Sequence, residues 1–492
     1  MRPIAFALFT ICAFQVPGKA QDGTLDSRLS AALNAAGFTG TMESQLEKRL
    51  GRPVDQTLAE LGRFLFFDKI LNLHCDNSCS GCHTPQAAFG DTQSIAIGIQ
   101  NNNFVGPHRF GPRNQRRTPG LVNDAFYPKL MWNGRFSSLS GDPFDNSQGF
   151  LFPPPEGTTR FPANDMVVKH LLIAQAHMPP TELTEAAGYT GTRGSISPDF
   201  DLFDDGLGDP VPPPDDSGYR NEPIRQTALQ HLNASYPYRD LFAKSYPEVG
   251  QGMPIDFSMV ARALAEFQFT LVFANAPIDQ YARGQQDAMT DSEKRGALMF
   301  FGKAACVSCH AVAGQSNEMF SDFTNRRIGV PQLAPPFGME SDNVVFDGPN
   351  QDEDYGAEQI SGDDTDRYAF RTSPLRNVGL QPAFFHDGAF RRLDDAIYHH
   401  LDVIQSAKLY DPAAAGVAPD LARRLGPIAP LLENLDPLIA SPIDLSPNEF
   451  DDLVAFVRNG LLDPRARPEN LCKLVPKELP SGMPLQIFEG CR

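Results

Sequence analysis

The sequence predicts a mainly α-helical protein made of two similar halves with long loops. The motif Cys-x-x-Cys-His occurs twice, at residues 79–83 and 306–310. A mainly apolar helical run with a Phe-Phe pair leads into each copy, over 61–72 and 294–305, whereas strand signals are weak throughout. The 43 prolines and 40 glycines favour long irregular connections. Two related helical domains are therefore expected.

The first residues have the features of an export signal. Arg2 supplies a positive charge, residues 4–16 are apolar, and small residues end the segment at Ala20. The apolar run is shorter than the roughly 20 residues that a transmembrane helix requires, and no later run is longer. We therefore expect a signal over 1–20, cleaved near Ala20, and a mature periplasmic protein without a transmembrane segment.

Capping signals mark where two helices of the second half begin. Thr290 and Glu293 have the spacing of a capping box. Ser446 is a favourable N-cap, followed by a proline at the first helical position and by Glu449 at the box position. The apolar residues of this last helix share one face at helical spacing: Phe450, Leu453, Val454 and Val457.

The expected organisation follows from these landmarks. A helix over 257–274 closes the first half, and 275–290 links the halves. The acidic, Pro-rich insertion 197–223 is expected to be a surface loop. The predicted parts are the signal at 1–20, a first domain at 21–280, a second domain at 281–470 and a tail at 471–492.

The overall charge excludes one class of function. The net charge is -18 and the pI is about 5.0. Nucleic-acid binding needs a basic surface, so it is not expected. The acidity serves solubility or attracts a basic partner.

The cysteines outside the two motifs leave one pairing open. Of eight cysteines, Cys12 lies in the signal and four belong to the motifs. Cys75, Cys472 and Cys491 remain, and three cysteines allow three choices of pair. A Cys472–Cys491 disulfide would close the tail and leave Cys75 free.

The repeated motif is typical of covalent haem attachment. Two thiols in this spacing form thioethers to one haem, and the adjacent histidine ligates its iron. Zinc is the alternative, but it needs a fourth ligand and gives no reason for a histidine directly after both Cys-x-x-Cys pairs. We therefore expect two cytochrome c-like helical domains with one c-type haem each. The attachment residues are Cys79, Cys82 and His83 for the first haem, and Cys306, Cys309 and His310 for the second.

From about Leu58 to Leu461 the chain resembles the bacterial di-haem cytochrome c peroxidases, including the related di-haem enzymes that mature methylamine dehydrogenase. The motifs that carry the resemblance are GRFLFFD, SCSGCH, AFGD, RRTPGLVNDAFYPKLMWNGRF, LLIAQAHMPPTELTEAAG, FFGKAACVSCH, GVP and YAFRTSPLRNVGLQPAFFHDGAFRRLDDAIYHHL. They follow the order of the family.

The resemblance implies that the first haem, with His83 as its proximal iron ligand, has an open distal face. Gln175, Pro179 and Glu185 match the distal residues of the maturation enzymes. A carboxylate there can take a proton from peroxide and return it to the other oxygen. Glu182 is the alternative for this role, and a solvated carboxylate is the plain structural interpretation of either residue.

The resemblance implies a closed second haem. Its iron has His310 on one face, and the position fourteen residues after His386 supplies the other ligand. That residue is His400, with His399 as the alternative. Trp132, the only tryptophan, matches a residue that the family places between the haems. His386 is expected near a haem propionate.

Six further positions bear on the resemblance. The family often binds calcium between the haems, but Arg117 replaces the asparagine ligand, with Gln381 and Ala383 at the carbonyl positions. Calcium is therefore not expected. His108 is a loop histidine that could block the open haem, and His177 or Met178 would close it.

The expected function is a periplasmic di-haem peroxidase that reduces hydrogen peroxide. Its electrons would come from a small soluble cytochrome or copper protein. The alternatives are a maturase-like oxidase of a protein or organic substrate, and a di-haem electron carrier without catalysis. The sequence does not decide the oligomeric state, for which a homodimer is one option.

Overall fold

The computed structural model describes residues 23–151, 161–196, 198–335, 353–423 and 425–491, so the predicted signal lies outside the described residues. It is mostly helical, with 42% helix and 6% strand, as predicted. The helices of the first half and the linker are α1 (Leu25–Ala36), α2 (Leu46–Leu50), α3 (Gln56–Phe67), α4 (Cys79–Cys82), α5 (Leu171–Gln175), α6 (Asn221–Ala234), α7 (Tyr236–Ser245), α8 (Pro247–Gly250), α9 (Phe257–Phe269) and α10 (Pro277–Ala282). Those that follow are α11 (Asp291–Phe301), α12 (Glu358–Ser361), α13 (Leu393–Leu401), α14 (Val403–Lys408), α15 (Ile428–Glu433), α16 (Pro447–Ala455) and α17 (Pro468–Leu471).

The described strands are short and form small separate sheets. They are β1 (Phe104–Val105), β2 (Lys129–Leu130), β3 (Phe136–Ser138), β4 (Phe150–Leu151), β5 (Asn325–Arg326), β6 (Phe370–Arg371) and β7 (Ile487–Phe488). Strand β1 pairs in parallel with β7, and the order β2-β3-β4 is antiparallel, as is the β5–β6 pair. In register, Lys129 faces Ser137 and Asn325 faces Arg371.

Each half is built around a close crossing of two helices that meet at a glycine of the repeated run. A Cβ on Gly62 of α3 would lie 1.9 Å from the carbonyl oxygen of Ala263 in α9. A Cβ on Gly296 of α11 would lie 1.9 Å from the carbonyl oxygen of Asp452 in α16. Only glycine allows backbones to approach this closely. The sequence repeat therefore corresponds to a repeated helix crossing.

The capping predictions for α11 and α16 are confirmed. Thr290 and Glu293 form a complete capping box at α11, and Ser446 and Glu449 form one at α16. The apolar face of the last helix is also confirmed, because Leu453 and its apolar neighbours pack into the core of the second half.

The helix predicted over 257–274 is too long. It ends at Phe269, with Thr270 as its C-cap. The Asn123 side chain then binds the backbone of Phe273, accepting from its N–H at 2.7 Å and donating to its carbonyl at 3.0 Å. This side chain offers the backbone an alternative to helical hydrogen bonds.

The predicted linker 275–290 contains the helix α10. Asp279 in this helix accepts hydrogen bonds from Arg376 at 2.7 and 2.8 Å, and both side chains are fully buried. A buried charge pair requires its neighbours to pack around it, because either charge alone would be costly. The connection between the halves is therefore packed structure.

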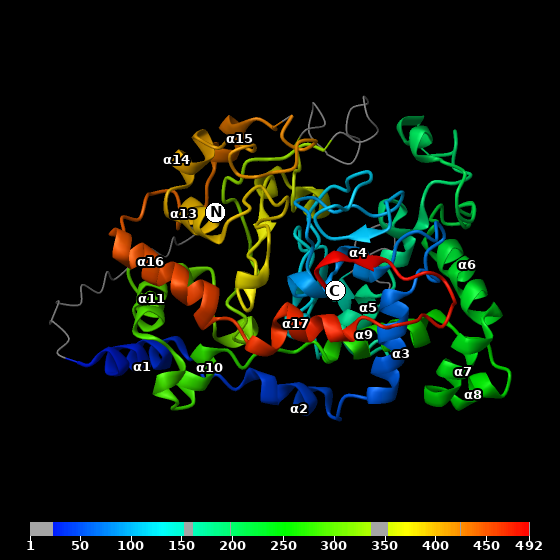
Figure 1. Ribbon diagram of the computed structural model, residues 1–492, viewed down its shortest axis with the longest axis horizontal. Helices are drawn as coiled ribbons and strands as arrows, with labels where there is room; N and C mark the ends of the chain where they lie inside the picture. The colour runs from blue at the N-terminus through cyan, green and yellow to red at the C-terminus, as the bar shows by residue number, and fades with distance from the viewer. Residues whose placement is uncertain (1–22, 152–160, 197, 336–352, 424, 492) are drawn as a thin grey trace, which may run out of the picture.

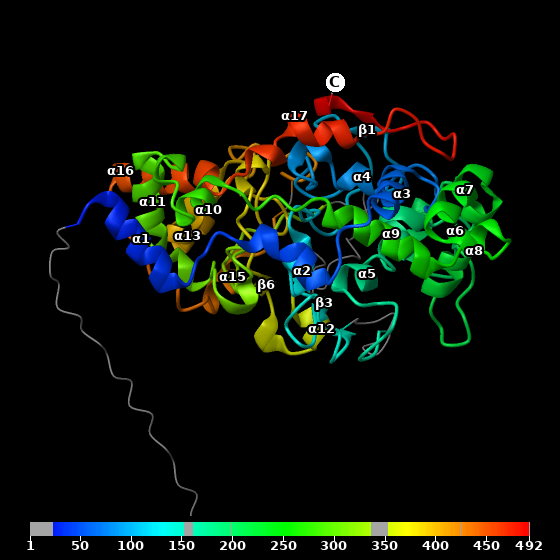
Figure 2. The ribbon, with the colours of Figure 1, turned by 90° about the horizontal axis from the view of Figure 1, so that it is seen from below.

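The two ends of the chain pack on opposite halves. Figures 1 and 2 show α1 beside α11 and α16, and the C-terminal segment beside α4 and β1. The first cluster of core residues includes Phe67, Phe267, Leu471, Leu479 and Phe488, and the second includes Leu29, Leu33, Phe300 and Leu453. Residues 25–38, which the predicted boundary assigns to the first domain, thus join the core of the second half.

Of the three cysteine pairings that the sequence left open, the structure shows the Cys472–Cys491 disulfide, and Cys75 is a free, half-buried thiol. The described part of the acidic insertion begins with a short helical turn and continues as loop, as expected, but its last three residues begin α6. Two histidines anchor it: His74 lies 3.1 Å from Asp205, and His231 lies 2.5 Å from Asp209.

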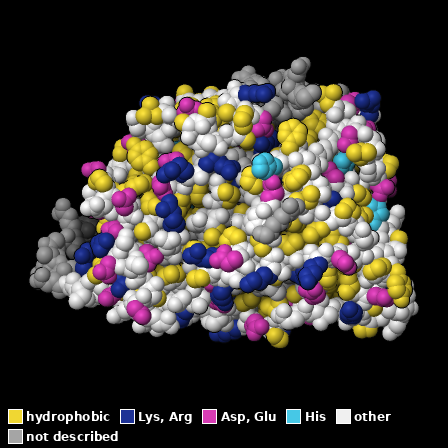
Figure 3. Space-filling view, in the orientation of Figure 1, with side chains coloured by type: hydrophobic (Ala, Val, Ile, Leu, Met, Phe, Trp, Pro, Cys, Tyr) yellow, Lys and Arg dark blue, Asp and Glu magenta, His cyan; other side chains and the backbone are white. Residues whose placement is uncertain are grey.

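Charges of both signs are interspersed on the face shown in Figure 3. The net negative charge therefore makes no single-signed patch on that face. No helix among the described residues is long and apolar enough to cross a membrane.

We expect Gly62→Ala and Gly296→Ala each to destabilise the protein by about 1–3 kcal/mol, because the added methyl group overpacks a backbone crossing. Denaturant unfolding of the haem-loaded protein measures this. Gly250→Ala is the matched control, since a Cβ there would contact only the side chain of Ala243. Equal stability of all three variants would show that the crossings tolerate a side chain.

Candidate functional site

The first Cys-x-x-Cys-His motif borders a cavity of about 290 Å³. The predicted residues of the first site all line it: Cys79, Cys82, His83, Trp132, Gln175, Pro179 and Glu185. They come from α4, from the loop between β2 and β3, and from α5 with the turns that follow it. The fold thus brings segments that are distant in the sequence to one cavity.

The imidazole of His83 is oriented to ligate a metal. Its Nδ1 lies 3.1 Å from the carbonyl oxygen of Phe89. Only an N–H can donate to a carbonyl, so Nε2 keeps its lone pair. Burial lowers the pKa of His83 to about 4, and the ring is therefore neutral. A neutral imidazole with a fixed tautomer is what iron ligation requires.

Glu185 lies on a π-helical turn (Leu183–Ala187) whose backbone is tied to the loops around the first motif. Its carbonyl accepts a hydrogen bond from Asn77 Nδ2 at 2.9 Å, and the preceding carbonyl accepts from the N–H of Ile99 at 3.1 Å. Burial and the nearby Glu182 carboxylate raise the pKa of Glu185 to about 7, against the effect of Arg135. A carboxyl with this pKa can both accept and donate a proton near neutral pH.

Glu182, the alternative to Glu185, has a different position in the cavity. It forms an ion pair with Arg135, and both side chains line the cavity. Arg135 was not predicted as a site residue. The only signal for it was its place at the end of the WNGR stretch that contains Trp132.

The residues that could close the first site do not all reach it. His83 is the only histidine among the described residues that line the cavity. His177 is not among them, and its Nδ1 pairs with the carbonyl of Ile173 at 2.9 Å. Met178 lines the cavity, with its sulfur 3.9 Å from Asn221. His108 is exposed and pairs with Glu489 of the tail at 2.7 Å.

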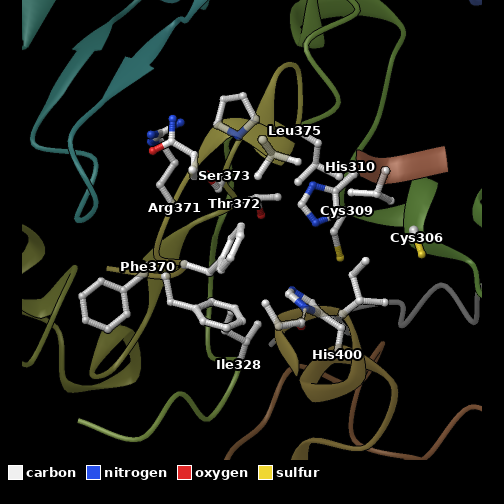
Figure 4. Close-up of a pocket in the computed structure, with 18 of the residues that line it drawn as sticks. Cys306, Cys309, His310, Ile328, Phe370, Arg371, Thr372, Ser373, Leu375 and His400 are labelled. Carbon is white, nitrogen blue, oxygen red and sulfur yellow. Dashed lines mark hydrogen bonds between the residues drawn. The ribbon is translucent and has the colours of Figure 1, made fainter. Parts of the chain in front are cut away.

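The second motif borders a cavity of about 240 Å³ in the second half. Its predicted residues Cys306, Cys309, His310 and His400 line it together. Figure 4 shows His310 and His400 pointing into the cavity from opposite sides, with His400 projecting from α13. Two imidazoles therefore face each other in the second cavity.

The spacing of these imidazoles suits a single metal ion between them. Their ring centres are 6.1 Å apart. Metal–imidazole bonds are about 2 Å long, which leaves room for one ion between the two Nε2 atoms. Nδ1 of His310 lies 2.9 Å from the Phe320 carbonyl and Nδ1 of His400 lies 2.8 Å from the Ala396 carbonyl, so both Nε2 atoms keep their lone pairs. Burial lowers the pKa of both rings, to about 4 for His310.

His399 does not compete for this position in the described structure. Its Nδ1 lies 3.0 Å from the hydroxyl of Ser406, and its Nε2 lies 2.8 Å from the carbonyl of Ile328. With both ring nitrogens engaged, it has no atom left for a metal.

One wall separates the two cavities and contributes to both. The residues that line both are Arg117, Thr118, Pro119, Gly120, Tyr127, Trp132 and Arg371. Trp132 is fixed at both ends: its Nε1 donates to the carbonyl of Arg117 at 2.7 Å, and its carbonyl accepts from the N–H of Arg371 at 2.7 Å. The indole predicted to lie between the sites thus borders each of them.

Several buried polar groups in the cavity walls have no hydrogen-bond partner in the described part of the chain. They include Nη1 of Arg371, which lines both cavities, and Nε2 of His386, which lines the second. His386 stacks on Phe370, with ring centres 3.6 Å apart. A buried polar group of this kind is usually satisfied by an ordered water, an ion or a ligand. A haem with its carboxylate propionates fits these groups and the thiol and imidazole sets.

Arg117, at the position where the resemblance implied a calcium ligand, holds the halves together. Its guanidinium donates to the carbonyl of Asp91 at 2.7 Å, to the carbonyl of Gln93 and to Oε1 of Gln381 at 2.9 Å. Ala383 lines the second cavity. Among the described residues, no group of three or more His, Cys, Asp or Glu side chains is arranged to hold a metal ion.

Comparison with known proteins gives a consistent result. Residues 56–287 match the family model of di-haem cytochrome c peroxidases. The chain is 25% identical over 353 residues to methylamine utilization protein MauG of Methylophilus methylotrophus, which covers 71% of this chain and 74% of that protein. It is 24% identical over 355 residues to cytochrome c551 peroxidase of Pseudomonas aeruginosa, with 72% and 74% covered.

Two solved structures share the fold. A MauG-like protein associated with microbial copper homeostasis superposes with a TM-score of 0.53 at 22% identity, covering 85% of this chain and 92% of that one. The di-haem peroxidase BthA of Burkholderia thailandensis gives a TM-score of 0.51 at 18% identity, with 85% and 89% covered. In its repeated motif, in the match over residues 56–287 and in these relatives, the chain is similar to the di-haem cytochrome c peroxidases.

Proposed function

We propose that this protein is a periplasmic di-haem c-type peroxidase that reduces hydrogen peroxide with electrons from a small soluble cytochrome or copper protein. The observation that carries the proposal is the asymmetry of the two cavities. Among its described lining residues, the first has a single histidine, His83, together with the carboxyl group of Glu185. The second has two imidazoles, His310 and His400, facing each other. An open iron suits peroxide, and a closed iron suits electron transfer.

Each cavity would hold one covalently attached haem. The thiols of Cys79 and Cys82 would attach the first haem, and His83 would ligate its iron. Cys306, Cys309 and His310 would do the same for the second haem, with His400 as a further iron ligand. When bound, the haems supply the redox chemistry that cleaves the peroxide bond and stores oxidising equivalents. Arg371 would neutralise propionate charge at the wall between them.

Glu185 transfers a proton during the reaction. Its carboxylate accepts a proton from one oxygen of hydrogen peroxide and donates it to the other oxygen, which leaves as water when the O–O bond breaks. The amide of Gln175 offers a hydrogen-bond donor and acceptor to hold peroxide. Pro179 shapes the wall of the cavity and has no backbone N–H that could donate a hydrogen bond to peroxide or to the Glu185 carboxylate.

Trp132 provides the route between the sites. Its indole lines both cavities, and hydrogen bonds at its ring nitrogen and its carbonyl fix it in place. An aromatic ring held between two redox centres shortens the distance that an electron must cross. Two electrons and two protons, delivered through this arrangement, convert one peroxide molecule into two water molecules.

One observation favours a second candidate, an oxidase of the MauG type that acts on a protein or organic substrate. Two imidazoles on the second iron would give it a lower reduction potential than the Met/His ligation of a cytochrome c. A low potential makes it less ready to take electrons from a high-potential donor protein. An electron carrier without catalysis has less support, because the first cavity combines a lone histidine with Glu185.

We expect Glu185→Gln to lower the rate of peroxide turnover by about 10²–10⁴-fold, because the amide cannot accept the proton. The measurement is peroxide-dependent oxidation of reduced cytochrome c or a copper protein, with haem content checked by absorption spectra. Glu60→Gln, an exposed carboxylate paired with Arg63, is the matched control. Failure of the unmodified protein with several donors, despite a spectral response to peroxide, would favour the MauG-type candidate.

We expect the rate of peroxide turnover to fall as the pH decreases below about 7. Below the pKa of Glu185, about 7, the carboxyl is protonated and cannot accept a proton, so activity falls as pH decreases. Glu182→Gln removes the negative charge that raises this pKa, and the decline of the rate should move to lower pH. Rate profiles from pH 5 to 9 measure both effects. If the decline of the rate at low pH were unchanged in Glu185→Gln, it would arise from another titrating group.

We expect His400→Met to raise the reduction potential of the second haem, because methionine ligation stabilises ferrous iron relative to imidazole. Redox titration followed by absorption spectra measures the shift. His399→Asn is the matched control and should leave the potential and the low-spin signal unchanged, since both nitrogens of His399 bind other protein groups. If only His399→Asn lost the low-spin signal, His399 and not His400 would be the iron ligand.

A further inference from the structure

The C-terminal tail lies against the first haem-attachment motif. It follows α17 and is closed by the Cys472–Cys491 disulfide. Its strand β7 adds in parallel to β1, with Phe104 opposite Ile487. Phe488 packs edge-on against Phe67 at the end of α3, with ring centres 5.7 Å apart. The tail is thus bound to the first half by backbone pairing and by apolar contact.

Within this tail, the side chain of Gln486 packs against the first motif and the residues just before it. Only 2% of Gln486 is exposed. Its Oε1 accepts a hydrogen bond from the hydroxyl of Ser78 at 2.8 Å, and its Nε2 donates to Oδ1 of Asn77 and to the carbonyl of Asp76, each at 3.4 Å. A Cβ on Gly81, inside the motif, would lie 2.8 Å from Oε1 of Gln486. The amide therefore fits against the glycine of the motif.

Asn77 connects this amide to the predicted catalytic acid. Its Oδ1 accepts from Nη2 of Arg109 at 2.8 Å as well as from Gln486. Its Nδ2 donates to the backbone carbonyl of Glu185 at 2.9 Å. Because donors from two residues converge on Oδ1, the orientation of the amide is fixed and Nδ2 must face Glu185. Two buried side chains thus lead from the tail to the turn that carries Glu185.

We propose that the tail is a working part of the peroxide site, in which Gln486 is a positioning residue that fixes Asn77 and, through it, the backbone of Glu185. The inference rests on the proposed role of Glu185 in peroxide reduction. Proton transfer needs donor and acceptor within hydrogen-bond reach, and a misplacement of about 1 Å can cost about 10²-fold in rate. The disulfide limits the freedom of the tail, which keeps Gln486 in contact with the motif.

The test uses the haem-loaded full chain and follows the rate of the peroxide-induced spectral change at pH 9, where Glu185 is ionised. The variants are Gln486→Met, Asn77→Asp and the two combined. Each single variant should be about tenfold slower or more at unchanged haem content and unchanged melting temperature. Because Gln486 acts through Asn77, the double variant should be no slower than Asn77→Asp alone.

The matched control is Glu489→Gln, three residues further along the tail. It removes the negative charge that contacts His108 and leaves the contacts of Gln486 in place, so the rate should equal that of the unmodified protein. Where Gln486→Met loads less haem, Gln486→Glu is the second variant, because it keeps the acceptor for Ser78 but loses the donor to Asn77. The same tenfold loss is expected.

Different results would overturn different statements. A peroxide rate in Gln486→Met and Gln486→Glu equal to that of the unmodified protein would overturn the positioning role. So would a double variant slowed by the product of the two single effects, because the residues would then act independently. An unmodified, fully loaded protein that gives no spectral response to peroxide would instead refute the proposed function.

Discussion

The two cavities depend on one shared wall, which Arg117 holds together. Its buried guanidinium donates to two backbone carbonyls of the first half and to the Gln381 side chain of the second, and its own carbonyl accepts the indole N–H of Trp132. A buried cation must be surrounded by acceptors, because leaving it without them would cost several kcal/mol. Satisfying Arg117 therefore fixes the relative position of the halves and of the aromatic ring between them.

Around this wall, the same local design serves two different ends. Both halves present a thiol pair, a histidine with Nδ1 on a backbone carbonyl, and a helix crossing made possible by a glycine. What differs is the element that covers the far side of each cavity. In the second half, α13 brings His400 to face His310. In the first, a short helix and turns bring Glu185 with its raised pKa. The two cavities therefore differ in the segments that cover them and not in the repeated motif.

Much of the site could be predicted because its residues lie in short motifs whose chemistry depends on local spacing. The pair of thiols and the following histidine need no tertiary information, and the capping boxes of α11 and α16 are equally local. Arg135, Arg371 and Asn77 were missed for the opposite reason, since each acts through a partner far away in the sequence. The helix predicted over 257–274 was too long because of a tertiary contact, since the Asn123 side chain binds the backbone of Phe273, where the helix would have continued.

The sequence by itself determined that the protein is mainly helical, that it carries the Cys-x-x-Cys-His motif twice, each time after a similar helical run, and which histidines and carboxylates were candidates. It could do so because helix periodicity, caps and the five-residue motif are short-range properties of the chain. Only the tertiary structure decided that His400 and not His399 faces His310 and that Trp132 borders both cavities. It also decided that the N-terminal helix packs on the second half and the C-terminal tail on the first. Those outcomes depend on which side of a helix meets a cavity and on contacts between residues hundreds of positions apart, and such contacts form only when the whole chain packs.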